Sequence, residues 1–354
     1  MSNEINGKRQ MLRYVGDISQ LFGVKEYTLR GGKAEGVRAI DVRNGSGLEF
    51  TIVADRAMDI SNLSYKGVNF SFISKTGVVA PQYFEEPGIG FARSFFAGFL
   101  TTCGLSNVGA PCVDNGMAYG AHGRISNIPA EQVYAGVEWE KELPLMKIKG
   151  QMREARLVGE NLYLNREYIC KYGENKFYIN DVVENYGFRK EPLMILYHFN
   201  LGYPLLSPDS YFVAPSEDII PKNDDAAAGI KDHNKFHDPV QGYREQVFYH
   251  KLKSDPDGKT FAALINSVLE LGVVIRFNTK QLNKLTQWKM MAEGDYVLGI
   301  EPCNCFGDGR AKARETGTLE FIDPGEKRTF NLEVEVLEGM ENIRKFEEAC
   351  YKKA

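Results

Sequence analysis

The sequence predicts an all-β fold, a large antiparallel β-sandwich. Apolar and polar side chains alternate with a period of two over 48–54, 68–72 and 330–336, which is typical of half-buried strands. Helical spacing of apolar residues is rare, and it is clearest over 340–350 near the C-terminus. Many strand-like runs with few helical ones favour two packed sheets.

The N-terminal part predicts a short helix over 11–22 and then strands. A turn at Lys66-Gly67 separates the strand at 48–54 from the one at 68–72 and indicates a hairpin. The uncharged run 94–113 is 20 residues long, but its glycines, proline and polar side chains exclude a membrane helix, which needs about 20 predominantly apolar residues. We expect a buried, glycine-rich strand or loop there.

The later part predicts paired strands. Turn residues at 172–175 and 270–272 divide the runs 161–187 and 261–278 into two strands each. The segment 192–203 is a mostly apolar strand that contains one histidine.

A strong turn signal, Asp323-Pro324-Gly325-Glu326, separates Leu319 and Phe321 from the strand at 330–336 and predicts another hairpin. The polar segment 215–239 is interpreted as a long loop.

The chain shows neither a Pro/Ser-rich linker nor a repeat of about 20–50 residues. We therefore expect a single domain over 1–354. A short N-terminal extension over about 1–20 and a C-terminal helix over about 340–354 would flank it.

Composition excludes several classes of protein. Lys and Arg number 43 and Asp and Glu 47, so the net charge is −4, without the basic excess of nucleic-acid-binding proteins. Six cysteines are too few for a disulfide scaffold, and the spacing of Cys303 and Cys305 does not suit a zinc site. The N-terminal residues lack the apolar core of a signal peptide. We expect a cytoplasmic protein with reduced thiols and no metal.

Three residues are candidates for acid/base chemistry. His198 interrupts an apolar strand, and Glu301 follows the apolar stretch 296–300, where a carboxylate is costly to bury unless it is paired or functional. His122 lies in a glycine-containing loop. The alternatives are a satisfied core residue for His198, a strand-end carboxylate turned to solvent for Glu301 and a surface loop residue for His122. An imidazole, with an unperturbed pKa of about 6.5, suits proton transfer near neutral pH. Because no nucleotide-binding motif is present, we expect this chemistry to need no cofactor.

Two arginines flank the glycine-rich run. The guanidinium groups of Arg93 and Arg124 can bind sugar hydroxyls, carboxylate or phosphate. The alternative for each is a solvated surface arginine.

Several short motifs together resemble the aldose 1-epimerase, or galactose mutarotase-like, superfamily, and within it the DUF4432 group. These motifs are FFAGFLTTCGL at 95–105, HGR at 122–124, YHFNLG at 197–202, LGIEP at 298–302, DRAMDI at 55–60 and PGE at 324–326. The resemblance covers roughly residues 20–340. It implies the galactose mutarotase-like supersandwich, an antiparallel β-sandwich with the sugar in a cleft on one sheet.

The resemblance also implies roles for single residues. The family's glutamate base falls on Glu301, its histidine acid on His198, and its second sugar-site histidine on His122. Arg93 and Arg124 are the nearest counterparts of the arginines found in such sites. Glu301 would take the proton of the anomeric hydroxyl while His198 protonates the ring oxygen, which opens the ring.

We expect His122, His198 and Glu301 to meet in one open cleft. For Glu301 and His198 to act across a bound pyranose, they should lie several ångströms apart, too far to touch, and each should lie within about 2.6–3.2 Å of a different sugar oxygen.

The sequence thus predicts a cofactor-independent, aldose 1-epimerase-like isomerase whose partner is a small-molecule sugar, and neither nucleic acid nor membrane. Two alternatives stay open: a non-catalytic carbohydrate-binding protein, and an isomerase or lyase that acts on an acidic or phosphorylated sugar. Retention of both histidines and Glu301 favours catalysis, because binding alone needs no acid/base pair. The oligomeric state is not predicted.

Overall fold

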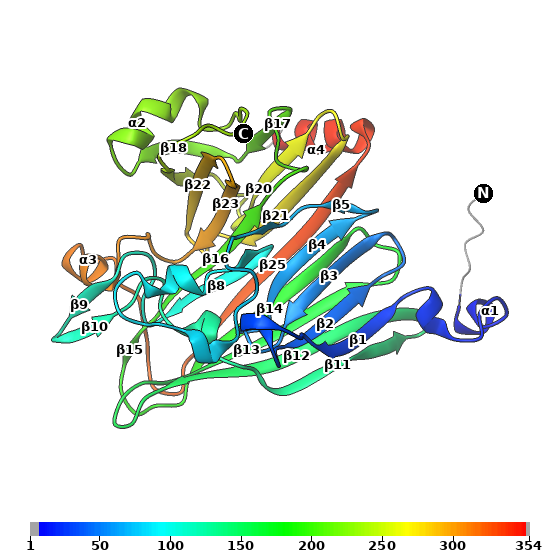
Figure 1. The fold of residues 1–354 in the computed structure, drawn as a ribbon, viewed down its shortest axis with the longest axis horizontal. Coiled ribbons are helices and arrows are strands. Elements are labelled where there is room, and N and C mark those ends of the chain that lie inside the picture. Colours follow the sequence, from blue (N-terminus) through cyan, green and yellow to red (C-terminus); the bar gives the residue numbers. More distant parts are fainter. Residues whose placement is uncertain (1–6, 352–354) are drawn as a thin grey trace.

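Two large antiparallel sheets stack on each other in the structure, a computed structural model that describes residues 7–351 (Figure 1). Strands make up 49% of the chain and helices 13%, which confirms the predicted β-sandwich. The N-terminal extension expected over 1–20 and the helix expected over 340–354 both reach beyond the described residues.

The first sheet has 11 strands. Its order is β1 (Gly23–Thr28), β2 (Arg38–Arg43), β3 (Leu48–Val53), β4 (Asp59–Tyr65), β8 (Leu100–Leu105), β16 (Met194–Leu201), β23 (Asp295–Cys303), β22 (Lys284–Ala292), β19 (Gln246–Leu252) and β18 (Ser216–Pro221), with β5 (Val68–Asn69) paired to β4.

The second sheet has eight strands. Its order is β11 (Glu131–Glu140), β12 (Leu143–Ala155), β13 (Asn161–Lys171), β14 (Lys176–Asn185), β25 (Lys327–Glu338), β21 (Leu271–Asn278), β20 (Lys259–Asn266) and β17 (Ser210–Val213). Three two-stranded pairs complete the described β structure: β6 (Phe72–Ile73) with β7 (Ala97–Gly98), β9 (Cys112–Asp114) with β10 (Met117–Tyr119), and β15 (Glu191–Pro192) with β24 (Phe321–Ile322).

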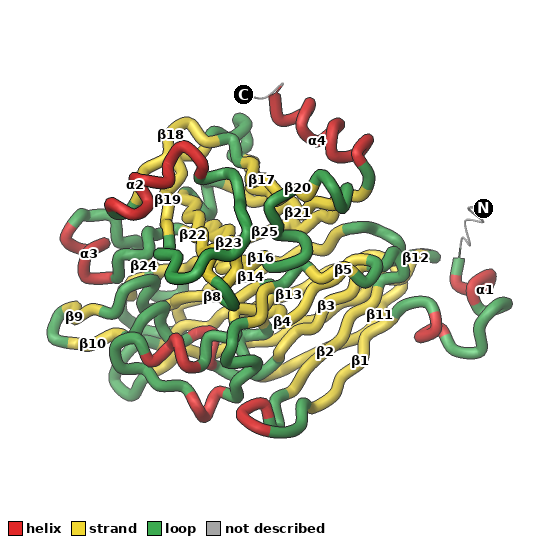
Figure 2. The backbone as a smooth tube through the Cα atoms, turned by 45° about the horizontal axis from the view of Figure 1, so that its top comes forward, coloured by secondary structure: helices red, strands yellow, loops and turns green. Residues whose placement is uncertain are grey.

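Helices lie at the rim of the sandwich (Figure 2). They are α1 (Lys8–Met11), α2 (Asp224–Gly229), α3 (Arg310–Glu315) and α4 (Met340–Tyr351), with short 3-10 turns at Ile18–Gln20, Gly32–Ala34, Pro81–Tyr83, Gly90–Arg93, Ile125–Asn127 and Ile230–Asp232. Within the described residues, no helix combines the length and the hydropathy that a bilayer crossing requires.

The main core lies between the two sheets, where the alternating strands place their apolar side chains. In β14, for example, every second residue is buried, and Phe177 stacks on Phe50 of the facing sheet with ring centroids 4.6 Å apart. Full burial of such a side chain contributes about 1.5–3 kcal/mol.

Some local predictions were wrong. The turn at Asp323-Glu326 forms, with Glu326 N–H donating to Asp323 O at 3.0 Å, but it does not close a hairpin. Strand β24 pairs with β15, whereas β25 pairs with β14 and β21. The strand expected at 68–72 is divided between β5 and β6, which join different partners.

Two further segments differ from expectation. The polar segment 215–239 is not a plain loop, since it contains the edge strand β18 and helix α2, whose polar residues face solvent. The helix expected over 11–22 is reduced to the 3-10 turn Ile18–Gln20, because the Asp17 side chain accepts the Ser19 N–H and starts a new turn there.

A buried ion network joins the two sheets. The fully buried guanidinium of Arg166 on β13 lies 2.8 Å from Asp59 of β4 and 2.6 Å from Asp181 of β14. It also donates to Thr102 Oγ1 of β8 at 2.8 Å, while the Tyr197 hydroxyl of β16 donates to Asp181 at 2.7 Å. The network therefore fixes β8 and β16 of the first sheet against β13 and β14 of the second.

Replacing this guanidinium should destabilise the protein strongly. Arg166→Met leaves two buried carboxylates without their cation, and breaking a buried pair in this way costs about 3–5 kcal/mol. Urea unfolding followed by circular dichroism measures the loss. Arg153→Met, which removes an exposed arginine 3.9 Å from Glu131, is the matched control and should change little. Equal stability of the two variants would contradict the structural role given to Arg166.

Candidate active site

The candidate site lies on the face of the first sheet that points away from the second sheet. Along β16, the side chains of Ile195, Tyr197 and Phe199 enter the main core between the sheets. The alternate residues, His198 among them, face the opposite way, where a smaller apolar cluster lies beneath the loops that cover this end of the sheet. Glu301 on β23 shares that outer face, since its neighbour Ile300 enters the main core.

Strand register brings His198 and Glu301 into contact. The pairs Leu196↔Cys303 and Phe199↔Ile300 bracket them, so the two residues stand opposite each other on neighbouring strands. His198 Nε2 lies 3.2 Å from Glu301 Oε1. The expectation that the two side chains are too far apart to touch was therefore wrong. Directly opposed residues of antiparallel strands have Cβ atoms about 4.5–5.5 Å apart, and side chains of this length meet across that gap.

His122 approaches the pair from a covering loop. Its imidazole centroid lies 5.9 Å from that of His198 and 5.0 Å from the ring of Phe91. The backbone is held by a hydrogen bond from His122 N–H to Gly109 O at 2.9 Å and one from Gly104 N–H to His122 O at 3.0 Å. These contacts keep His122 at φ 58°, a left-handed conformation that is uncommon for a non-glycine residue and that clusters at functional sites.

Gly299 and Trp288 form one side of the cluster. Gly299 lies two residues before Glu301 on the same face, and a Cβ there would lie 2.6 Å from Glu301 Oε1 and 3.3 Å from His198 Cε1. The backbone of β23 is therefore packed so closely against Glu301 and Trp288 that only glycine fits at this position. Trp288, opposite Gly299 in register, places its ring centroid 5.5 Å from His198 and donates its indole N–H to Glu245 at 2.8 Å.

Two charged side chains, Lys222 and Asp308, lie around the cluster without contacting His198 or Glu301 directly. Lys222 and Asp308 lie 3.9 Å apart, and the Tyr249 hydroxyl donates to Asp308 at 3.0 Å. The Lys222 ammonium acts on the pKa values of both His122 and Glu301.

Unpartnered polar atoms concentrate in this cluster. Among the described side chains that are not exposed, seven buried nitrogen or oxygen atoms lack a hydrogen-bond partner. Four of them are here: His122 Nδ1, His198 Nδ1, Asn200 Oδ1 and Glu301 Oε1. Each such atom costs about 1–3 kcal/mol unless it finds a partner, so four in one cluster make it a candidate binding site.

Burial suppresses charge on the His198–Glu301 pair. It raises the pKa of Glu301 to about 8, with the Lys222 ammonium opposing the shift and Glu245 adding to it. Burial, and then the neighbouring His122, lower the pKa of His198 to about 3. Burial and the Lys222 charge lower the pKa of His122 to about 4. At neutral pH the pair therefore holds one proton, which resides on Glu301 rather than on His198.

Arg93 and Arg124 pair with loop carboxylates. Arg93 donates to Glu85 at 2.8 Å, and Arg124 donates to Glu86 at 2.6 Å and lies 3.9 Å from Glu160. These ion pairs direct both guanidinium groups toward covering loops, whereas the contacts of His198 are with Glu301 and aromatic rings.

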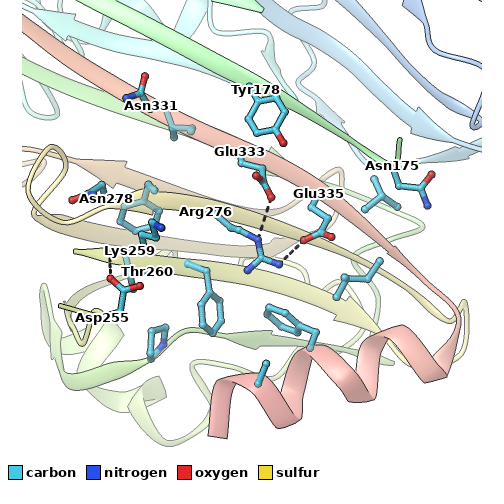
Figure 3. Close-up of a pocket in the computed structure, with 18 of the residues that line it drawn as sticks. Asn175, Tyr178, Asp255, Lys259, Thr260, Arg276, Asn278, Asn331, Glu333 and Glu335 are labelled. Atoms are coloured by element: carbon cyan, nitrogen blue, oxygen red, sulfur yellow. Dashed lines mark hydrogen bonds and ion pairs between the residues drawn. The ribbon is translucent and has the colours of Figure 1, made fainter. Parts of the chain in front are cut away.

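A large cavity elsewhere does not have these features. It has a volume of about 1000 Å³ and lies on the second sheet beside α4 (Figure 3). Arg276 on its floor pairs with Glu333 at 3.3 Å and with Glu335. None of the unpartnered buried atoms found in the described residues belongs to its lining, so the chemistry points to the His198–Glu301 cluster instead.

Sequence reasoning missed Asn200, Trp288 and Gly299. The signal was present in part, because Asn200 and Gly299 lie two residues from His198 and Glu301, and strand alternation places such residues on the same face. The position of Trp288 beside the site follows from the pairing of β22 with β23, which the sequence alone does not reveal. In the described part of the chain, no group of three or more His, Cys, Asp or Glu side chains is arranged to hold a metal ion.

Comparisons with known structures agree with this architecture. A candidate aldose 1-epimerase from Klebsiella pneumoniae is 28% identical, with a TM-score of 0.89 over 93% of this chain and 87% of that one. A galactose mutarotase-like protein from Clostridium acetobutylicum is 16% identical, with a TM-score of 0.62 over 89% and 98% of the two chains. Galactose 1-epimerase from Lactobacillus acidophilus is 14% identical, with a TM-score of 0.55 over 89% and 99%.

No curated protein matches the sequence. The family model DUF4432, a domain of unknown function, matches residues 34–336. The chain therefore belongs to the DUF4432 family, and its fold is that of the galactose mutarotase-like β-sandwiches.

Proposed function

We propose that this protein is an aldose 1-epimerase-like isomerase that interconverts the anomers of a sugar by acid/base ring opening and closure. The observation that carries the proposal is the buried Glu301–His198 pair, whose Oε1 and Nε2 atoms lie 3.2 Å apart, with the unpartnered Nδ1 of His122 beside it. A polyhydroxylated ring supplies hydroxyl groups, each both donor and acceptor, to such atoms. The similarity to aldose 1-epimerases and mutarotase-like proteins supports the same function.

The one-proton pair meets the requirement of the reaction. As the proton of Glu301 passes to His198 Nε2, 3.2 Å away, a carboxylate base and an imidazolium acid form. Glu301 takes the proton of the anomeric hydroxyl while His198 protonates the ring oxygen, and the C1–O5 bond breaks to give the open aldehyde. Rotation about C1–C2 presents the other carbonyl face. Ring closure then runs the two transfers backwards, so no proton is gained or lost.

The surrounding residues suit an uncharged sugar. Trp288 offers an aromatic surface beside His198, and His122 offers an unpartnered ring nitrogen to a hydroxyl. An acidic or phosphorylated substrate was expected to use Arg93 and Arg124, but both are paired with glutamates of the covering loops. The geometry therefore favours a neutral aldose over an anionic one.

Removing the carboxylate should separate catalysis from binding. Glu301→Gln keeps the shape and one acceptor but cannot exchange the proton, so we expect the anomerisation rate to fall by about 10²–10⁴-fold. Sugar affinity should change by no more than about tenfold, since a single neutral hydrogen bond contributes only about 0.5–1.5 kcal/mol of net free energy. Polarimetry of freshly dissolved α-glucose, α-galactose and other aldoses measures the rate.

Trp288 fluorescence measures the affinity. The chain has two tryptophans, so Trp139→Phe leaves Trp288 as the reporter beside the site. Glu333→Gln, in the cavity of the other sheet, is the control and should leave both rate and affinity unchanged. Full activity of Glu301→Gln would refute the proposed role. Sugar binding without anomerisation by the unmodified protein would favour the alternative of a carbohydrate-binding protein.

The pH profile of kcat/KM should follow the proton count of the pair. Between the pKa of His198, about 3, and that of Glu301, about 8, the pair holds one proton and is competent. Above about pH 8 Glu301 loses that proton, so activity should fall. Measurements from pH 5 to about 9.5, corrected for the hydroxide-catalysed reaction, test this.

The residual activity of Glu301→Gln should not fall above about pH 8, because its amide does not titrate. If the fall in activity persists unchanged in this variant, the titrating group is a different residue. His198→Asn should also lower the rate, by about 10²–10⁴-fold at the pH optimum.

A further inference from the structure

Asn200 lies on the same face of β16 as His198, two residues further along the strand. Its side chain is completely buried. The amide Nδ2 donates to Ala97 O at 3.1 Å and to His198 O at 2.8 Å, so both of its N–H groups are used. These two bonds fix the orientation of the amide, and Oδ1 is left without a hydrogen-bond partner.

His198 has a ring nitrogen that lacks a hydrogen-bond partner. Its Nε2 faces Glu301, while its Nδ1 is buried and has no partner. A neutral imidazole has one N–H and one lone pair, and the hydrogen bond made by one nitrogen sets the state of the other. When the proton of the pair resides on Glu301, Nε2 must be the acceptor, and Nδ1 must therefore carry the hydrogen.

We propose that Asn200 is a positioning residue whose Oδ1 accepts a hydrogen bond from His198 Nδ1–H and so holds Nε2 toward Glu301 as the proton-exchanging nitrogen. Its part in catalysis rests on the proposed function, but the tautomer it sets does not. The relay runs from Asn200 Oδ1 through the two imidazole nitrogens to the Glu301 carboxyl group. Neither Asn200 Oδ1 nor His198 Nδ1 has a partner in the orientation seen here, so the bond forms when the imidazole or the amide turns toward the other.

The same hydrogen bond also suits the protonated, imidazolium form of His198. When His198 takes the proton from Glu301, the imidazolium donates from both nitrogens, and the Asn200 oxygen still accepts from Nδ1. In agreement with this, the Asn200 side chain raises the pKa of His198 against the lowering caused by burial. An amide oxygen is neutral, so it orients the ring without placing a second charge next to Glu301.

The tautomer of His198 can be read directly in the unliganded, unmodified protein. Long-range ¹H–¹⁵N correlation NMR of the histidine side chains distinguishes Nδ1–H from Nε2–H, and His198→Asn identifies the signal among the five histidines. We expect Nδ1–H at neutral pH. A stable Nε2–H tautomer would overturn the proposal without any reference to activity.

Variants at position 200 complete the test. Asn200→Ala removes the acceptor, and we expect a mixed tautomer and a kcat/KM about 10- to 100-fold lower, the size of a hydrogen bond to a charged group. Asn200→Asp retains an oxygen acceptor, so it should restore the Nδ1–H tautomer. Its added charge should also move the His198 titration to higher pH.

Asn331→Ala, in the cavity of the second sheet, is the control and should change neither tautomer nor rate. Loss of the Nδ1–H tautomer in folded Asn200→Ala, as judged by circular dichroism, supports the role even if no sugar in the panel is anomerised. In that case the proposed function fails and the positioning role stands. An unchanged tautomer in a folded Asn200→Ala would refute the role of Asn200.

Discussion

The buried guanidinium of Arg166 is the interaction on which the site's geometry depends. It forms ion pairs with Asp59 and Asp181, which come from opposite sheets. Thr102 accepts a hydrogen bond from the same guanidinium, and the Tyr197 hydroxyl donates to Asp181. Tyr197 directly precedes His198 on β16, so anchoring its hydroxyl on one face of the strand fixes the imidazole on the other. The network inside the sandwich thus positions the His198–Glu301 pair on the outer face of the first sheet.

Burial of the acid/base pair then determines its chemistry. An isolated carboxylate and an imidazolium would each be charged in acidic water, but a site with few polar partners penalises both charges. The result is a raised pKa for Glu301 and a lowered one for His198, hence one shared proton over the whole neutral range. Mutarotation needs one acid and one base of this kind and no net proton. The desolvation that shifts both pKa values would therefore also prepare the pair for the proposed ring opening.

Local patterns predicted much of the fold, since a period of two residues shows a strand wherever one face is buried, as at 161–187. They could not predict which strands pair, and so β25 was assigned to the wrong hairpin. The site divides in the same way. His198, Glu301 and His122 were visible as polar residues in apolar or glycine-rich settings and through the family resemblance. Their contact distance, Trp288 and the pairing of Arg124 with Glu86 depend on register and loop packing, which no local pattern encodes.

Under the proposed function, substrate selectivity would follow from the same unpartnered atoms. If Asn200 satisfies His198 Nδ1, the atoms left for a ligand are His122 Nδ1 and, once its proton has passed to His198, Glu301 Oε1, beside the ring of Trp288. A ligand of this site would bring hydrogen-bonding groups on its edge and an apolar surface on its face. A pyranose ring combines both, whereas an apolar ligand would leave the two atoms unsatisfied at about 1–3 kcal/mol each. Under the proposed function, the site would therefore reject apolar molecules through the cost of its own incomplete hydrogen bonding, and a sugar hydroxyl that relieves this cost would lie where Glu301 and His198 exchange protons.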